Sequence, residues 1–140
     1  MPKKIRSKKS AQRSRIISRS ISWYGWVPDL PDHRDLIYAA PDKFVRALPP
    51  RVDLRKDCPP IYNQGKLGSC TAHAIGAAIE FDQMKQQWPE IFIPSRLFIY
   101  YNERVMEGTI NSDNGAQIRD GIKSVAKQGA CPRAIVALQD

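Results

Sequence analysis

Apolar residues recur at helical spacing in three stretches of the second half of the chain. In the first stretch, residues 70–87, Ile75, Ile79 and Phe81 recur at this spacing among alanines, and no proline interrupts them. Alanines around most of the helix circumference predict a helix that packs closely on several sides. Pro89 marks its end, because a proline cannot continue the backbone hydrogen bonding of a helix.

The second and third predicted helices cover residues 94–108 and 115–129. Ser95 can cap the second helix, Gly108 can stop it, and Gly129 follows the third helix at the usual position of a terminating glycine. The apolar face of the second helix is predicted to hold Leu97, Tyr100, Tyr101 and Val105. That of the third is predicted to hold Ile118, Ile122, Val125 and Ala126. No run of alternating polarity predicts a strand.

Residues 23–49 have a different pattern, in which prolines favour extended chain. The prolines of this region are Pro28, Pro31, Pro41 and Pro49, with Pro50 directly after it. The side chains that need cover are Trp23, Tyr24, Trp26, Leu36, Ile37, Tyr38 and Phe44. Because these side chains gain from burial and the backbone cannot form a long helix, we predict an extended strap, similar to a pro-segment, that lies across the surface of a folded unit.

Charge separates the N-terminus from the rest of the chain. The net charge is +8, and eight of the 22 lysines and arginines lie in residues 1–28, which hold no acidic residue. The remaining chain carries equal numbers of basic and acidic residues. Residues 1–22 are rich in serine and basic residues and nearly free of apolar ones, so they cannot bury enough surface to offset the entropy of ordering. We predict a disordered basic tail.

The basic tail has two alternative interpretations. An arginine- and serine-rich start without acidic residues is also typical of organelle transit peptides, and residues 3–19 suit weak contact with nucleic acid or an anionic surface. The overall composition, with 42% hydrophobic and 26% charged residues, is that of a soluble globular protein. No stretch reaches the roughly 20 apolar residues of a transmembrane segment, and no secretory signal peptide is recognised. We expect a cytoplasmic or unassigned location.

The stretch NQGKLGSCTAHA, residues 63–74, carries the candidate chemistry. Gly65 and Gly68 allow tight turns just before the first helix, and Cys70 falls in its first turn. There the unpaired N–H groups and the positive end of the helix dipole favour a thiolate, which is the nucleophilic form of cysteine. The N–H of Cys70 and the side-chain amide of Gln64 can donate to one point and form an oxyanion hole. This arrangement suits nucleophilic attack on an amide or ester.

The same stretch resembles the active-site segment of papain-like (C1) cysteine peptidases, in which a glutamine and the nucleophilic cysteine have this separation. LPPRVDLR (48–55) is similar to the start of the mature enzyme, and SDNGAQIRDGIKSVAKQGACP (112–132) is similar to the segment whose glycine pair lines the substrate cleft. GWVPDLPDHRD (25–35) resembles the short N-terminal extension of microbial members.

This resemblance implies a fold and roles for particular residues. It implies that Cys70 is the nucleophile and Gln64 an oxyanion-hole donor in a peptidase whose substrate is a peptide or protein, with neither metal nor cofactor. The implied substrate-binding residues are Gly68, Ser69, Asn114 and Gly115, with Asn114 in place of the first glycine of the pair. Residues 50–140 are expected to form the mainly α, helical half of a papain-like α+β fold, without its β-rich half.

The chain also departs from the family pattern. Leu67 stands where the family often has a disulfide cysteine, which suits an intracellular or microbial branch, and Thr71 stands where it has an aromatic residue. The general base of such enzymes is a histidine roughly 130–150 residues after the cysteine, and only 70 residues follow Cys70. His33 lies in the strap and His73 on the same helix as the cysteine, so neither is expected to serve. We therefore predict a truncated peptidase that is inactive by itself.

Two alternatives stay open. A non-catalytic binding module would keep half of a peptide cleft and use the basic tail for an acidic partner. A zinc site would combine Cys70 and His73 with Cys58 and Cys131, although structural zinc sites usually present two close pairs of ligands. Outside such a site, Cys58 and Cys131 are expected to be buried structural cysteines, or else to pair with each other.

Overall fold

The structure, a computed structural model, describes residues 24–37 and 39–136. The elements in these residues are β1 (Trp26–Val27), α1 (Asp42–Val45), α2 (Cys70–Lys85), α3 (Arg96–Glu107), β2 (Ala116–Gln117), α4 (Ile118–Gln128) and the 3-10 turn η1 (Arg133–Val136). The predicted basic tail, residues 1–22, lies outside the described residues. Among the helices of the described part, none has the length and apolar character needed to span a bilayer.

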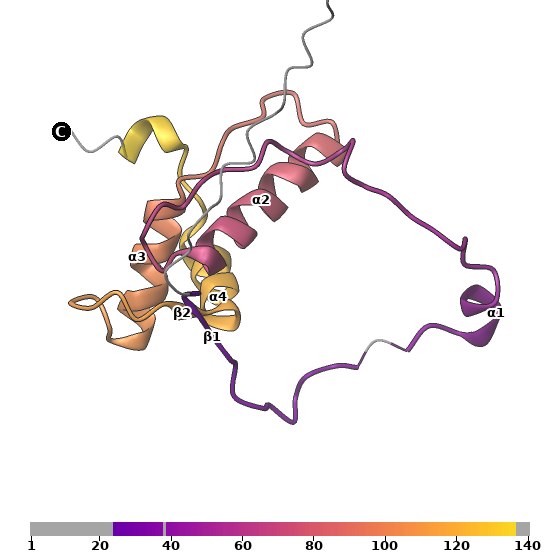
Figure 1. Ribbon diagram of the computed structural model, residues 1–140, viewed down its shortest axis with the longest axis horizontal. Helices are drawn as coiled ribbons and strands as arrows, with labels where there is room; N and C mark the ends of the chain where they lie inside the picture. The colour runs from indigo at the N-terminus through magenta and orange to yellow at the C-terminus, as the bar shows by residue number, and fades with distance from the viewer. Residues whose placement is uncertain (1–23, 38, 137–140) are drawn as a thin grey trace, which may run out of the picture.

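The helices α2, α3 and α4 pack against one another and form the folded unit (Figure 1). Their bounds confirm the three helices that the sequence predicts. Ser95 caps α3 by accepting a hydrogen bond from Phe98 N–H, and Gly108 ends it with a φ of 69°, a conformation that glycine adopts without strain. The short helix α1 lies on a loop that runs away from this unit (Figure 1), and none of its residues is buried.

The core of the unit is small. It holds Ala72, Ile75, Ile99, Tyr100 and Ala116, with Leu67, Ile79 and Val125 packed against them. Close approach of α4 depends on Gly121, where a Cβ atom would stand 2.3 Å from Glu103 Oε1 and 2.4 Å from Ile75 Cδ1. The contacts of α4 with α2 and α3 at this point therefore require a residue without a side chain.

The predicted apolar face of α3 is mostly wrong. Three of its four members are exposed, namely Leu97, Tyr101 and Val105. The buried face contains Ile99, Tyr100 and Glu103. It includes a phenol and a carboxyl because both find polar partners inside the protein: Tyr100 bonds to Asp113 and Glu103 to Thr71.

The predicted packing of α2 and α4 also needs correction. α2 is not covered around most of its circumference, because Ala74 and Ala78 are exposed. The exposed members of the α4 stripe are Ile118, Ile122 and Ala126, and only Val125 packs against the core. The buried positions of α4 are Gly121 and Ser124. Small residues thus form the face of α4 that meets the other helices, and its large apolar side chains remain on the surface.

Two short strands are present that the sequence pattern did not predict. β1 and β2 pair in parallel, with Trp26 opposite Ala116 and Val27 opposite Gln117. Next to them, Ala116 N–H donates to Gly25 O at 2.8 Å. Strands of two residues are too short to display an alternation of polarity, so only the folded structure reveals this pairing.

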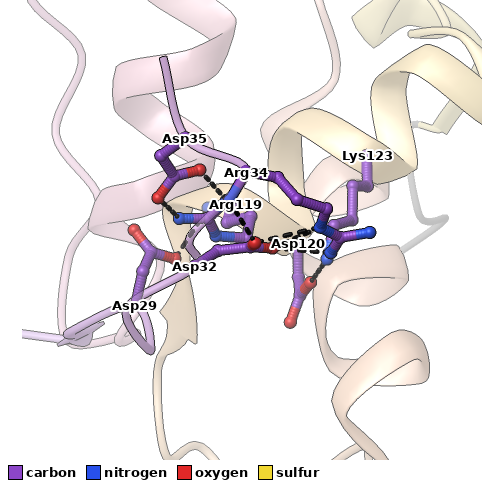
Figure 2. A network of polar contacts seen from close by, with 7 residues as sticks. All are labelled: Asp29, Asp32, Arg34, Asp35, Arg119, Asp120 and Lys123. Carbon is purple, nitrogen blue, oxygen red and sulfur yellow. Dashed lines mark hydrogen bonds and ion pairs between the residues drawn. The ribbon is translucent and has the colours of Figure 1, made fainter. Parts of the chain in front are cut away.

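The N-terminal segment, residues 24–35, is also joined to α4 by a polar network (Figure 2). Asp29 accepts from Arg119 N–H at 3.0 Å, and Asp35 accepts two bonds of 2.7 Å from the Arg119 guanidinium. This guanidinium lowers the pKa of Asp35, and the Arg34 side chain lowers the pKa of Asp32 to about 2. The network attaches the first part of the predicted strap to the helical unit.

The rest of the predicted strap has few such contacts. Leu36, Ile37 and Phe44 are exposed by 98%, 92% and 57%, and the chain here follows a wide loop (Figure 1). Tyr24 and Trp26 are exposed as well, whereas Trp23 and Tyr38 lie outside the described residues. The described side chains therefore do not receive the cover that the sequence analysis assigns to them. The bounds of a strap at residues 23–49 stay a prediction.

Candidate nucleophilic cysteine site

Cys70 is the first residue of α2, and its thiol is free and half-buried. At this position the backbone N–H has no partner within the helix. The preceding residue, Ser69, makes no side-chain capping bond to the helix. Its hydroxyl instead lies 3.3 Å from His73 Nδ1. The N–H groups of the first turn are therefore not bonded to the Ser69 side chain.

Gln64 is folded onto the turn that leads to Cys70. Gly65 has a φ of 66°, and Gln64 Nε2 donates to Leu67 O at 2.9 Å. A side-chain amide carries two N–H donors, so this bond fixes the orientation of Gln64 and leaves one N–H for another acceptor. The assignment of Gln64 to an oxyanion hole stays a prediction.

The backbones of Gly68 and Gly115, two of the predicted substrate-binding residues, both lie against Gly25. A Cβ atom on Gly25 would stand 1.7 Å from Gly68 O, and one on Gly115 would stand 1.9 Å from Gly25 O. Gly115 also has a φ of 77°, which strains residues other than glycine. The sequence-predicted positions thus come together around an extended strand, which here belongs to the N-terminal segment.

The other two predicted substrate-binding residues differ in their exposure. Asn114 is exposed beside Gly115. Ser69 is 1% exposed, and its hydroxyl lies against His73. Any contact of Ser69 with a peptide would therefore use its backbone.

Asp113 links the two glycine loops, and sequence reasoning missed it. Gly68 N–H donates to both carboxylate oxygens of Asp113 at 3.0 Å. The Tyr100 hydroxyl also donates to this carboxylate, and Gly115 N–H donates to Tyr100 Oη at 3.2 Å. Burial and the bond to Asp113 raise the pKa of Tyr100, which keeps its hydroxyl protonated. No local pattern marks Asp113, because its partner Gly68 lies 45 positions away.

Thr71, which replaces the aromatic residue expected from the resemblance, donates to Glu103 Oε2 at 2.8 Å. Glu103 is completely buried. This burial raises its pKa to about 7, although the bond from Thr71 acts in the opposite direction. The bond ties the first turn of α2, which carries Cys70, to α3.

Neither histidine of the described residues makes a hydrogen bond to Cys70. His73 Nδ1 lies 2.9 Å from Ser69 O, and since a carbonyl can only accept, this nitrogen carries the proton. Burial lowers the pKa of His73, which favours a neutral ring. His33 is exposed in the N-terminal segment.

Among the described residues, the remaining cysteines form neither a disulfide nor part of a metal-binding cluster. Cys58 is exposed and Cys131 half-buried, and both are free. Cys58 is therefore not the buried cysteine that the sequence analysis expects. Residues 24–37 and 39–136 contain no group of three or more His, Cys, Asp or Glu side chains that could hold a metal ion. The four-ligand zinc alternative is not assembled there.

Two known proteins are similar to the chain. A protein of Acanthamoeba polyphaga mimivirus, named an uncharacterized peptidase C1-like protein, is 41% identical over 124 residues, which covers 77% of this chain and 40% of that protein. The crystal structure of xylellain, a cysteine protease from Xylella fastidiosa, matches with a TM-score of 0.74 and 50% identity, over 84% of this chain and 43% of that chain. No family model matches.

These matches show which class of protein the chain is similar to. Over most of its length it resembles papain-like C1 cysteine peptidases, which confirms the resemblance predicted from its motifs. It spans about two fifths of the length of the two relatives that it matches. Its helices and few strands agree with the helical half of that fold.

Proposed function

We propose that the chain supplies the nucleophile and the oxyanion hole of a papain-like cysteine peptidase. The observation that carries the proposal is the position of Cys70 at the first residue of α2, directly after the turn on which Gln64 is fixed. The Cys70 thiolate adds to the carbonyl carbon of a peptide bond, and the charge moves to the carbonyl oxygen. The N–H of Cys70 and the free N–H of Gln64 then donate to this oxygen.

The peptide substrate is proposed to bind as an extended strand beside Gly68 and Gly115. Support comes from the backbone of Gly25, which already lies against both glycines, and from the parallel pairing of β1 with β2. Residues 25–27 occupy this edge in the structure. A substrate that replaces them would bind through the same kind of backbone hydrogen bonds and be selected by pockets for alternate side chains. Asn114, exposed at the end of this edge, is proposed to contact the peptide as well.

The chain alone is proposed to lack turnover, because its own histidines do not suit the acid–base role. His73 donates to the backbone carbonyl of Ser69, the residue before its helix, and burial favours its neutral form, so it is not arranged to form an ion pair with the thiolate. Collapse of the intermediate also needs a proton for the leaving amine, and such assistance is worth about 10²–10⁴-fold. We propose that this group comes from a part of the protein outside these 140 residues.

The proposal is tested first by the selectivity of thiol labelling. Cys58 is exposed and Cys70 half-buried, so exposure alone predicts that Cys58 reacts first with iodoacetamide. If the start of α2 activates Cys70, it is labelled ahead of both Cys58 and Cys131, as followed by mass spectrometry of the peptides. Labelling in the order of exposure contradicts the proposal.

Turnover is tested with a fluorogenic peptide. The chain and its Cys70→Ala variant should give the same background rate. A Cys70-dependent rate that disappears in His73→Ala, but not in the control His33→Ala, would show that His73 is the base. Such a result would overturn the proposed inactivity of the chain alone.

The second candidate function is a non-catalytic peptide-binding module with a basic tail for an acidic partner. It is favoured by the strand edge at Gly68 and Gly115, which needs no nucleophile. This function predicts peptide binding that is unchanged in Cys70→Ala and thiol labelling without selectivity for Cys70. Isothermal titration with a peptide, carried out on both forms, separates the two functions.

A further inference from the structure

We propose that Asp113 is a positioning residue that sets the spacing between Gly68 and Gly115, the two glycines on which the peptide strand would lie. Tyr100 is the second member of this device. The proposal rests on the proposed function, because this spacing affects a reaction only if a peptide binds beside Cys70.

The device is a continuous chain of hydrogen bonds between two loops. Gly115 N–H donates to Tyr100 Oη, the Tyr100 hydroxyl donates to Asp113, and Gly68 N–H donates to the same carboxylate. Tyr100 is 1% exposed on α3, so the middle of the chain is anchored in the core. Hydrogen bonds to an ionised acceptor are stronger than neutral ones. The Asp113 carboxylate can therefore restrain the positions of both loops.

The loop that carries Asp113 is itself restrained by Arg104. Its guanidinium lies over the Tyr100 ring, 4.3 Å from the centroid. Arg104 Nη1 donates to Ile110 O at 3.3 Å and to Ser112 O at 3.1 Å. These contacts hold the loop between α3 and β2 and thereby orient the Asp113 carboxylate toward Gly68.

This arrangement holds the two loops together without a covalent link. Leu67 occupies the position of the family's disulfide cysteine and cannot form a covalent link. Asp113 restrains the next residue, Gly68, to a loop 45 positions away. All three cysteines of the described residues are free. The restraint therefore does not depend on the redox conditions.

The spacing between Gly68 and Gly115 can change only slightly before a strand no longer fits between them. Gly25 fits against Gly68 and Gly115 only because neither Gly25 nor Gly115 has a Cβ atom. A small relative shift of the two loops would therefore change the fit of a bound strand. The position of Cys70 at the start of α2 would not change. Loss of Asp113 should then impair peptide recognition more than the intrinsic reactivity of the thiol.

Backbone amide exchange measured by NMR tests the device directly. In Asp113→Ala, Gly68 N–H should exchange at least about tenfold faster, because its bond to a charged acceptor is lost. Gly115 N–H should also exchange faster, because its acceptor, the Tyr100 hydroxyl, loses the carboxylate that holds it in place. Asp113→Asn, which keeps one acceptor oxygen, should give a smaller change, and Tyr100→Phe should accelerate exchange at both glycines. The controls are Tyr101→Phe and Asp42→Asn, two exposed positions that should change neither rate.

Coupling between the loops is the decisive result. Unchanged exchange at Gly115 in the Asp113 variants would overturn the proposal, because Asp113 would then act on Gly68 alone. Melting curves identify any variant that does not fold. If Asp113→Ala is unfolded, the same comparison is decided by Asp113→Asn and Tyr100→Phe.

Thiol labelling gives a second readout and separates this proposal from the proposed function. In Asp113→Ala, the rate of Cys70 labelling by a peptidyl chloromethyl ketone should fall about tenfold, while the rate with iodoacetamide stays within about twofold. An equal fall in both rates contradicts a positioning role. Failure of wild-type Cys70 to react selectively with either reagent would overturn the proposed function, whereas amide exchange would still decide the role of Asp113.

Discussion

Replacing Glu103 with glutamine should remove a pH dependence of stability that its buried carboxyl creates. Glu103 is 0% exposed, and burial raises its pKa from an ordinary value of 4.5 to about 7. The folded protein therefore keeps a proton that the unfolded chain releases. The stabilising contribution of this proton is fully present below pH 4.5 and is lost as the pH rises to about 7. Above that pH, the folded protein contains a buried carboxylate.

The size of the effect follows from the change in pKa. At about 1.4 kcal/mol for each pKa unit, the free energy of unfolding should fall by roughly 3 kcal/mol between pH 4.5 and pH 8 through this group. Glutamine has nearly the same shape, carries no charge and keeps an oxygen that can accept the Thr71 hydroxyl. Glu103→Gln should therefore match the wild type near pH 5 and be more stable by roughly 2–3 kcal/mol at pH 8.

Urea unfolding of both proteins at pH 5, 6, 7 and 8, followed by tryptophan fluorescence, measures this difference. The charged neighbours Arg104 and Glu107, which also act on the pKa of Glu103, are present in both proteins and largely cancel in the comparison. Glu90→Gln, at an exposed position, is the control for loss of a carboxyl at the surface. A difference in unfolding free energy between wild type and Glu103→Gln that is the same at pH 5 and pH 8 would refute the reasoning.

Three further predictions concern the packing and the N-terminal part of the chain. Deletion of residues 1–22 should leave the melting temperature in thermal melts unchanged, and a fall of several degrees in that temperature would contradict the prediction. The deletion should also abolish any salt-sensitive affinity for nucleic acid, as measured by fluorescence anisotropy. Gly121→Ala should destabilise the protein by about 1–3 kcal/mol through overpacking, and an unchanged urea midpoint would count against the described contact. Limited proteolysis should cut residues 36–48 before residues 24–35, and Arg119→Ala should make residues 24–35 equally sensitive. If residues 24–35 stay protected in this variant, the polar network in Figure 2 is not what holds them.

The sequence predicts the helices of this unit better than it predicts their buried faces. Prolines, glycines and Ser95 end or begin helices through local backbone effects, so the bounds of α2, α3 and α4 can be predicted from nearby residues. The faces depend on tertiary packing. On α4 the large apolar residue Ile122 is exposed and the small residue Ser124 is buried, because close helix contact favours small side chains there.

In the candidate site, too, the sequence predicts the residues of a local motif but not those that contact it from distant positions. Cys70 and Gln64 belong to one short motif that can be recognised without a structure. Asp113 and Glu103 act on that motif from positions that are distant in the sequence, and their partners are a backbone N–H and a threonine hydroxyl. Hydrogen bonds of this kind leave no periodic pattern, so sequence reasoning alone could not find them.

The close packing of Gly121 against Glu103 and Ile75 has a consequence for the evolution of this protein. A side chain at position 121 would occupy space that the Glu103 carboxyl and the Ile75 δ-methyl already fill. A larger residue there is compatible with the same helix spacing only when position 103 or 75 becomes smaller. Positions 103 and 121 are thus expected to covary among homologues, and the buried carboxyl should be found where position 121 is glycine.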